Sequence, residues 1–400
     1  MNIQRPDDWR HDEGVYQCSR DGIVPSAVYF HIPFCRHRCG YCDFTLVADR
    51  DDLIDDWLRA LANELRLMPG TTEVHSIFVG GGTPTHLRPG QLEQFLQLVA
   101  STFRLTPKGE YTFEANPDGL THDKVAILSS FGVNRLSLGV QSFDRDVLQR
   151  LERTHSPDDA RDTVVRVAGA IPNVSIDLIF GVPGQSPDSW RTTVMEATKL
   201  PVKHVSTYGL TFEKGTSFYQ RRARGELISA PSEVEREQYR AAMQILNDVG
   251  LIQYEISNFA RDGFRCAHNQ VYWNAQEYFA FGPGAARYLG GVRSTNGRNV
   301  SRWVESWLNG QPLLQDWEQL ATEDRAREAI MLGLRQNVGI QLDRFERRFD
   351  VSVIDLAPTA FTRHLDARLL ETASSAEGKQ FLRLTNEGRF LADTVITDFL

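Results

Sequence analysis

Short, nearly continuous apolar segments alternate along the chain with longer segments in which apolar residues recur every three or four positions. The short segments lie at residues 27–32, 75–80, 111–116, 135–141, 174–181 and 204–210. Continuous apolar runs are typical of parallel strands that are covered on both faces. The longer segments, such as 55–68 and 232–250, predict helices, and the second has Ser232 as its candidate N-cap and Gly250 at its end. The alternation therefore predicts an α/β fold, a partial (β/α)6 TIM-type barrel.

The second half of the chain follows a different pattern. From about residue 258 the sequence is rich in aromatic residues and glycine, without a clear period, and short helical segments return near its end. Two short β-like pieces around TNEGR resemble the wing of a winged helix, and residues 374–378 predict a turn. We expect an N-terminal extension at 1–25, the barrel at 26–257, a connecting region at 258–320 and a smaller C-terminal α+β, winged-helix-like domain at 321–400.

Composition and charge narrow the class of protein. The chain is 41% hydrophobic and 24% charged, with a net charge of −8, which argues against a long nucleic acid as the main partner. No apolar run approaches the roughly 18 residues of a membrane helix, and the polar start has no secretion signal. We therefore expect a cytoplasmic protein without a transmembrane segment. Five cysteines in such a chain favour metal or catalytic use over disulfides.

Three of these cysteines, Cys35, Cys39 and Cys42, lie in the stretch HIPFCRHRCGYCDF. A disulfide would leave one thiol over, and structural zinc normally takes four ligands in two separated pairs. His31 and His37 keep a zinc loop possible as an alternative. Thiolates suit iron–sulfur clusters, and C-x3-C-x2-C is the spacing of the radical S-adenosylmethionine (SAM) superfamily, in which three cysteines leave one iron open to SAM. The spacing therefore predicts a 4Fe–4S cluster.

Other unusual residues follow the predicted strands, at the barrel edge where chemistry is expected. GGGTPT at residues 80–85 follows the second strand, where glycines would allow the backbone to approach an amino acid. Glu114 and Asp177 lie on otherwise apolar strands, where a charge needs a partner. A ligand's ammonium and ribose groups would serve, and so would Arg135 or Arg153 in a structural ion pair. Gln141 ends the fourth strand.

The motif HNQVYW contains His268, Tyr272 and Trp273. A histidine beside aromatic residues is most often packed or hydrogen-bonded. Imidazole is also an axial ligand of haem iron, and the two rings would then form a flat apolar wall.

Ordered motifs from Tyr29 onward resemble the HemW group of haem chaperones, which is related to the oxygen-independent coproporphyrinogen III oxidases (HemN). They are YFHIPFCRHRCGYCDF, IFVGGGTPT, FEANPDG, NRLSLGVQSF, SIDLIFGVPGQ, YGLTFEKGT, QYEISNFA and HNQVYW. The resemblance implies that Cys35, Cys39 and Cys42 bind the cluster and that His268 binds haem. It implies that SAM is bound by Tyr29, Gly81, Gly82, Thr83, Glu114, Gln141, Arg153 and Asp177.

Within that resemblance, two positions bear on function. HemN-type oxidases have a fourth cysteine two residues beyond the third, where this chain has Phe44. Relatives of the group often have a histidine where this chain has Ala286, which changes the expected haem ligation. We expect a haem chaperone that passes haem to an acceptor protein. The alternative is a radical oxidase that decarboxylates coproporphyrinogen III and needs an electron donor to cleave SAM. A tRNA-modifying radical enzyme suits neither the charge nor HNQVYW.

Overall fold

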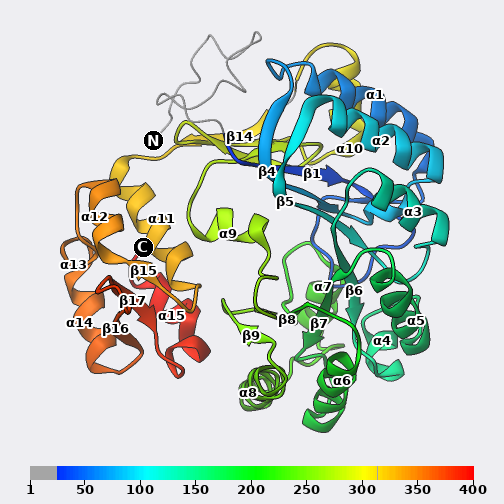
Figure 1. Ribbon diagram of the computed structural model, residues 1–400. Coiled ribbons are helices and arrows are strands. Elements are labelled where there is room, and N and C mark those ends of the chain that lie inside the picture. Colours follow the sequence, from blue (N-terminus) through cyan, green and yellow to red (C-terminus); the bar gives the residue numbers. More distant parts are fainter. Residues whose placement is uncertain (1–24, 313) are drawn as a thin grey trace. The chain divides into compact units, whose positions relative to one another are not determined.

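The computed structural model describes residues 25–312 and 314–400, so Cys18 and nearly all of the expected N-terminal extension lie outside the described residues. The chain divides into two compact units (Figure 1). Of the described residues, the first unit holds 25–38, 44–135, 277–312 and 314–319, and the second holds 39–43, 136–276 and 320–400. The division passes through the cysteine motif, with Cys35 in the first unit and Cys39 and Cys42 in the second. The four expected domain bounds stay predictions.

The first unit is built on parallel strands in the order β11-β1-β4-β5. These strands are β1 (Ala27–Ile32), β4 (Thr72–Gly81), β5 (Phe103–Ala115) and β11 (Phe279–Phe281). Two short strands, β2 (Phe34–Cys35) and β3 (Val47–Ala48), pair on either side of the cysteine motif. A separate antiparallel sheet joins β12 (Ala286–Leu289), β13 (Val292–Asn296) and β14 (Leu314–Gln319).

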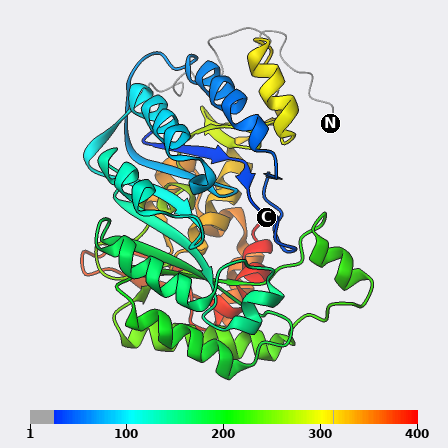
Figure 2. The ribbon, with the colours of Figure 1, turned by 90° about the vertical axis from the view of Figure 1, so that its right-hand side faces the viewer.

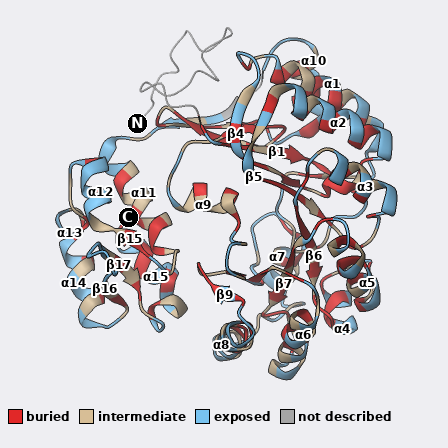
Figure 3. Ribbon diagram, in the orientation of Figure 1, coloured by how far each residue is buried: buried red, intermediate tan, exposed pale blue. Residues whose placement is uncertain are grey.

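Helices of the first unit follow its strands in sequence. They are α1 (Ile54–Leu65), α2 (Pro89–Thr102), α3 (His122–Ser130) and α10 (Val300–Leu308), with short 3-10 turns η3 (Asp51–Leu53) and η4 (Pro84–His86). α1 lies beside both α2 and α10, and Figure 2 shows the blue α1 and the cyan α2 side by side. The strands are largely buried, as Figure 3 shows for β1, β4 and β5, because apolar side chains extend from both faces of these strands.

A buried carboxylate ties distant segments of the first unit together. Glu64 on α1 is fully buried and accepts hydrogen bonds from the Gly282 amide at 2.8 Å and from Asn296 Nδ2 at 2.7 Å. The buried guanidinium of Arg287 lies 3.9 Å away. These partners offset the cost of removing the charge from water.

The second unit contains strands in the order β6-β7-β8-β10-β9, of which β7 and β8 are parallel. They are β6 (Arg135–Gln141), β7 (Asn173–Phe180), β8 (His204–Gly209), β9 (Ile252–Gln253) and β10 (Asn258–Ala260). The helices of this stretch are α4 (Arg145–Arg150), α5 (Pro157–Ala168), α6 (Pro187–Lys199), α7 (Ser217–Ala223), α8 (Ser232–Asp248) and α9 (Ala267–Trp273). α5 and α6 each begin with a serine N-cap followed by proline, a combination that favours helix initiation.

The C-terminal part of the second unit combines helices with a three-stranded sheet in the order β15-β17-β16. Its strands are β15 (Ile340–Gln341), β16 (Leu370–Ser374) and β17 (Gln380–Leu384). Its helices are α11 (Thr322–Leu334), α12 (Leu342–Phe349), α13 (Val353–Leu356), α14 (Pro358–Asp366), the 3-10 turn η5 (Gly388–Leu391) and α15 (Ala392–Thr397). Apolar side chains of these elements form their own core.

All six strands that the hydrophobic pattern predicts are present, although β4 and β5 begin earlier than expected. The predicted turn at residues 374–378 joins β16 to β17. The expectation of β structure on both sides of TNEGR is wrong, because β17 precedes the motif and η5 and α15 follow it. Ser232 is also inside α8 rather than its N-cap, which is Pro231, and α8 ends at Asp248. No helix within residues 25–312 and 314–400 combines the length and apolar character needed to cross a membrane.

Candidate functional site

The glycine turn at residues 80–83 ends β4 and lies against the segment that leads into the cysteine motif. Gly82 and Thr83 donate backbone hydrogen bonds to the carbonyls of Ile32 and Phe34, both at 2.8 Å. A Cβ on Gly82 would come within 2.7 Å of the Phe34 oxygen and 3.1 Å of Cys35 Sγ. Gly81 has a φ of 117°, which side chains rarely tolerate. Only glycine fits at these two positions.

Cys35 is buried beside this turn. Its sulfur lies 3.2 Å from Thr83 Oγ1, and Asn116 Nδ2 donates to the same oxygen at 2.9 Å. Because the amide occupies an acceptor position of the hydroxyl, the Thr83 proton is available to a Cys35 thiolate. Asn116 was not among the predicted site residues, although it directly follows β5, at a strand end where functional residues are expected.

Glu114 holds the turn from the other side. Its Oε2 accepts a hydrogen bond from the Gly81 amide at 3.2 Å, and a Cβ on Gly80 would lie 2.7 Å from the same oxygen. Burial, reinforced by the Glu114 charge, raises the pKa of Tyr29 well above its ordinary value. The first unit therefore brings together the predicted residues Tyr29, Cys35, Gly81, Gly82, Thr83 and Glu114.

His31, which sequence reasoning considered only as a zinc alternative, orders this part of the site. Its Nε2 lies 2.6 Å from the Thr45 carbonyl and must donate, so Nδ1 accepts the Tyr29 hydroxyl at 3.0 Å. Burial lowers the pKa of His31 to about 4, with a smaller contribution from the charge of Arg298. A neutral His31 therefore links β1 to the chain that follows the cysteine motif.

The second unit holds the remaining cysteines and a different set of polar groups. Arg153 lies with Nη1 3.6 Å from Cys39 Sγ, and its Nη2 donates to the Gly139 carbonyl at 3.0 Å. Glu152, which was not predicted, accepts the Gly40 amide at 2.8 Å through Oε2 and Arg221 at 3.1 Å through Oε1. The cationic Arg153 therefore points a guanidinium nitrogen at the sulfur of Cys39.

Asp177 and Gln141 occupy neighbouring strands of the second unit. Ser137 Oγ donates toward both carboxylate oxygens of Asp177 at 3.3 Å. Gln141 ends β6 with a φ of 65°, in the left-handed region that costs a residue other than glycine about 1 kcal/mol or more. Such backbone strain is commonly found at functional sites, and the role predicted for Gln141 stays a prediction.

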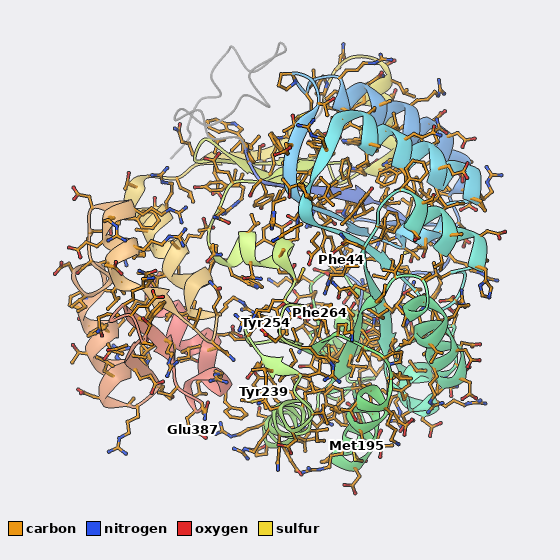
Figure 4. All side chains as sticks on the ribbon, in the orientation of Figure 1. Phe44, Met195, Tyr239, Tyr254, Phe264 and Glu387 are labelled. Carbon is orange, nitrogen blue, oxygen red and sulfur yellow. The ribbon has the colours of Figure 1, made fainter. Side chains whose placement is uncertain are left out.

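No three His, Cys, Asp or Glu side chains in the described part of the chain lie together as ligands of one metal ion. The ligand set Cys35, Cys39 and Cys42 therefore stays a prediction from spacing. Phe44, where the oxidases have a cysteine, is labelled in Figure 4, and this residue is 59% exposed.

The histidine of HNQVYW is packed inside the second unit. His268 on α9 is fully buried, and its Nε2 lies 2.8 Å from the Tyr272 hydroxyl. At the end of the same helix Trp273 is half-buried, with the Arg335 guanidinium 5.1 Å from its ring centroid. An iron ion could reach His268 Nε2 only if Tyr272 moved aside. Ala286 belongs to the first unit, where it pairs with Thr295 across β12 and β13.

Known proteins match this chain along most of its length. Residues 29–197 match the radical SAM superfamily, and residues 320–391 match the HemN C-terminal domain. A heme chaperone HemW from Bacillus subtilis is 35% identical over 379 residues, which cover 94% of this chain and 99% of that protein. A heme chaperone HemW from Mycobacterium tuberculosis (strain H37Rv) is 34% identical and covers 94% and 95% of the two chains.

Two further matches extend the comparison. The mitochondrial radical S-adenosyl methionine domain-containing protein 1 of Bos taurus is 34% identical, over 84% of this chain and 78% of that protein. The structure of the coproporphyrinogen III oxidase HemN from Escherichia coli superposes with a TM-score of 0.81 at 21% identity, covering 94% of this chain and 90% of that one. These matches confirm the predicted fold class, a radical SAM α/β fold with a smaller C-terminal domain.

Proposed function

The chain belongs to the HemW family of radical SAM proteins, and we propose from this membership that it is a haem chaperone, which binds haem and transfers it to an acceptor protein. The observation that carries the proposal is the match to proteins named heme chaperones over almost their entire length. Phe44 at the position of the oxidases' fourth cysteine also supports a chaperone over an oxidase. Location in the cytoplasm is part of the proposal.

We further propose a 4Fe–4S cluster on Cys35, Cys39 and Cys42. The surroundings of two of these thiols fit the anionic ligands that a cluster requires, since Thr83 can donate to Cys35 and Arg153 lies beside Cys39. When bound through three cysteines, such a cluster supplies one iron with an open coordination position. Because Gly82 has no side chain, no Cβ at that position crowds the Cys35 thiol.

SAM would be held by Tyr29, Gly81, Gly82, Thr83, Glu114, Gln141, Arg153 and Asp177. The chemistry of these donors fits the ligand: carboxylates suit its ammonium and ribose groups, and a guanidinium suits its carboxylate. Glu114 also fixes the Gly81 amide, so it would position the turn as well as contact the ligand. If SAM is cleaved, the protein needs an electron donor as a further partner.

Haem binding is assigned to the HNQVYW region, with His268 as the proposed iron ligand. Because His268 Nε2 is bonded to Tyr272, ligation would require this hydrogen bond to open. Trp273, at the end of the same helix, offers a further aromatic surface of the motif.

The test compares two activities of one preparation. Anaerobically reconstituted protein is titrated with haem and, separately, incubated with coproporphyrinogen III, SAM and a reductant. We expect a saturable Soret shift with haem and no decarboxylation of coproporphyrinogen III. Formation of protoporphyrinogen IX would show a radical oxidase and overturn the chaperone proposal.

A further inference from the structure

A cleft in the second unit opens between the end of α9 and the helices α11 and α12. The cavity volume of this cleft is about 180 Å³. The wider empty space around it, about 700 Å³, extends into open solvent. Its polar lining includes Asn274, Gln336, Arg344 and Arg348, and its aromatic lining includes Trp273 and Phe349. The lining residues include two arginines and no carboxylate, in a chain whose net charge is −8. Such a surface is complementary to a flat apolar molecule that carries negative charge.

The two arginines of the cleft differ in what they bind. Arg348 donates to the carbonyls of Asn274 at 2.9 Å and Ala275 at 2.5 Å, so it fastens α12 to the end of α9. Arg344 is exposed, and no hydrogen bond, ion pair or ring contact engages it within residues 25–312 and 314–400. Arg347, one turn along the same helix, pairs instead with Asp343 at 3.0 Å. Arg344 is therefore the cationic group of this cleft that is available to a ligand.

The HNQVYW motif contributes to the cleft with its end rather than with its histidine. His268 and Tyr272 are four residues apart and share one face of α9, where they bond to each other. Trp273 lies five residues after His268, a rotation of about 140° around the helix, and it lines the cleft together with Asn274. Gln336 Nε2 donates to the Trp273 carbonyl at 3.2 Å and so holds this helix end against α11.

We propose that this cleft binds the carboxylate-bearing edge of a tetrapyrrole, with Arg344 pairing with a propionate and Trp273 covering the adjacent ring. The inference rests on the proposed function, since it takes haem to be the cargo. A guanidinium binds a carboxylate through two parallel hydrogen bonds, and an indole provides a flat apolar face. The cleft is too small to enclose the whole macrocycle, so it holds one edge and leaves the rest exposed to an acceptor.

The experiment uses the full chain and separates carboxylate binding from iron ligation. Haem, metal-free protoporphyrin IX and its dimethyl ester are titrated into the wild-type protein and into Arg344→Ala, Arg344→Glu and Arg347→Ala. We expect Arg344→Ala to weaken binding of protoporphyrin IX about tenfold, because it removes the charge-assisted pair with the propionate, and Arg344→Glu to weaken it further. Arg347→Ala should bind as the wild type does, and the ester should not distinguish the variants.

Each other outcome has a separate meaning. If the wild type binds haem but both Arg344 variants bind protoporphyrin IX normally, the cleft proposal is wrong and the haem chaperone proposal stands. If Arg344→Ala weakens the ester as much as the free acid, pairing with a propionate is wrong. If the wild type binds neither haem nor protoporphyrin IX, both the proposed function and this inference are wrong.

Discussion

At Gly81 and Gly82, carbonyls of the protein's own chain lie where a side chain would have to be, whereas α9 carries a fully buried histidine that is bonded to a tyrosine. Gly81 and Gly82 were predicted from the idea that a ligand approaches the backbone closely. The structure gives them an additional cause, because the Ile32 and Phe34 oxygens already exclude a Cβ. His268 likewise has a partner within the protein.

The difference lies in what each region would have to change in order to bind its ligand. Near the turn, Glu114, Thr83 and Asn116 are already held by hydrogen bonds, and none of the contacts described has to break for a ligand to use their remaining acceptors. On α9, iron ligation would break the bond between His268 and Tyr272. A preorganised site binds at a lower cost than one that must rearrange. The predictions below test this contrast, beginning with the largest effect.

Removal of a cluster cysteine should abolish the cluster. We expect loss of the iron and of the charge-transfer absorbance after anaerobic reconstitution in each of Cys35→Ala, Cys39→Ala and Cys42→Ala. The reason is that the proposed cluster is bound by these three thiolates and needs all of them. Cys266→Ala removes a buried cysteine without cluster spacing and serves as the matched control. An equal loss of iron in Cys266→Ala would refute the assignment.

The role of His268 can be separated from that of its partner. If His268 ligates haem iron, His268→Ala should remove the Soret shift, and added imidazole should restore part of it. Tyr272→Phe keeps the imidazole and removes its hydrogen bond, so this variant should bind haem at least as well as the wild type. If His268 serves only in packing, both variants should instead lower the melting temperature and leave the Soret shift in place.

The carboxylates near the turn and on β7 should contribute to SAM affinity. Glu114→Gln and Asp177→Asn keep their hydrogen bonds to Gly81 and Ser137 but lose the charge. Loss of one charge-assisted hydrogen bond costs roughly 1.5–3 kcal/mol, or about 10- to 150-fold in the dissociation constant of SAM. Calorimetric titration of SAM into reconstituted protein measures this effect.

Glu110 provides the control for these carboxylates. It is buried on β5, the strand that carries Glu114, and it lies 3.9 Å from Arg135. Glu110→Gln should lower the melting temperature without changing SAM affinity. If Glu114→Gln behaves in the same way, Glu114 acts only in positioning the turn.

The smallest expected effect concerns pH and the neutral His31. Its pKa is lowered from 6.5 to about 4 in the folded protein, so the unfolded chain takes up a proton at a higher pH than the folded one. Stability from this group is therefore complete above about pH 6.5 and is lost as the pH falls toward 4. By linkage the loss at pH 5.5 is about 1.3 kcal/mol.

His31→Gln can keep both hydrogen bonds but does not titrate. The melting temperature of the wild type should fall more than that of His31→Gln between pH 7.5 and pH 5.5, in matched buffers. Parallel curves for the two proteins would show that His31 does not stay neutral in the folded state.

The local pattern of the sequence determined most of the fold. The six predicted strands and the helices α1 and α8 were found because a strand or helix buries side chains with its own period, which is a property of neighbouring residues. The cysteine spacing, the glycine run and HNQVYW carried the resemblance that the comparisons then confirmed. The bond between His268 and Tyr272 also follows from their spacing on one helix face.

Tertiary structure decided the features that depend on residues far apart in the chain. β11 pairs with β1, which lies about 250 residues earlier in the chain. The local period of hydrophobic residues cannot indicate such a pairing. Glu64 on α1 finds its partners in Gly282, Asn296 and Arg287, and the tautomer of His31 is set by Tyr29 and Thr45. Glu152 and Asn116 joined the candidate site only through such contacts. Buried polar groups must be satisfied by whatever the fold brings within about 3 Å of them, and that proximity arises only when the chain is folded.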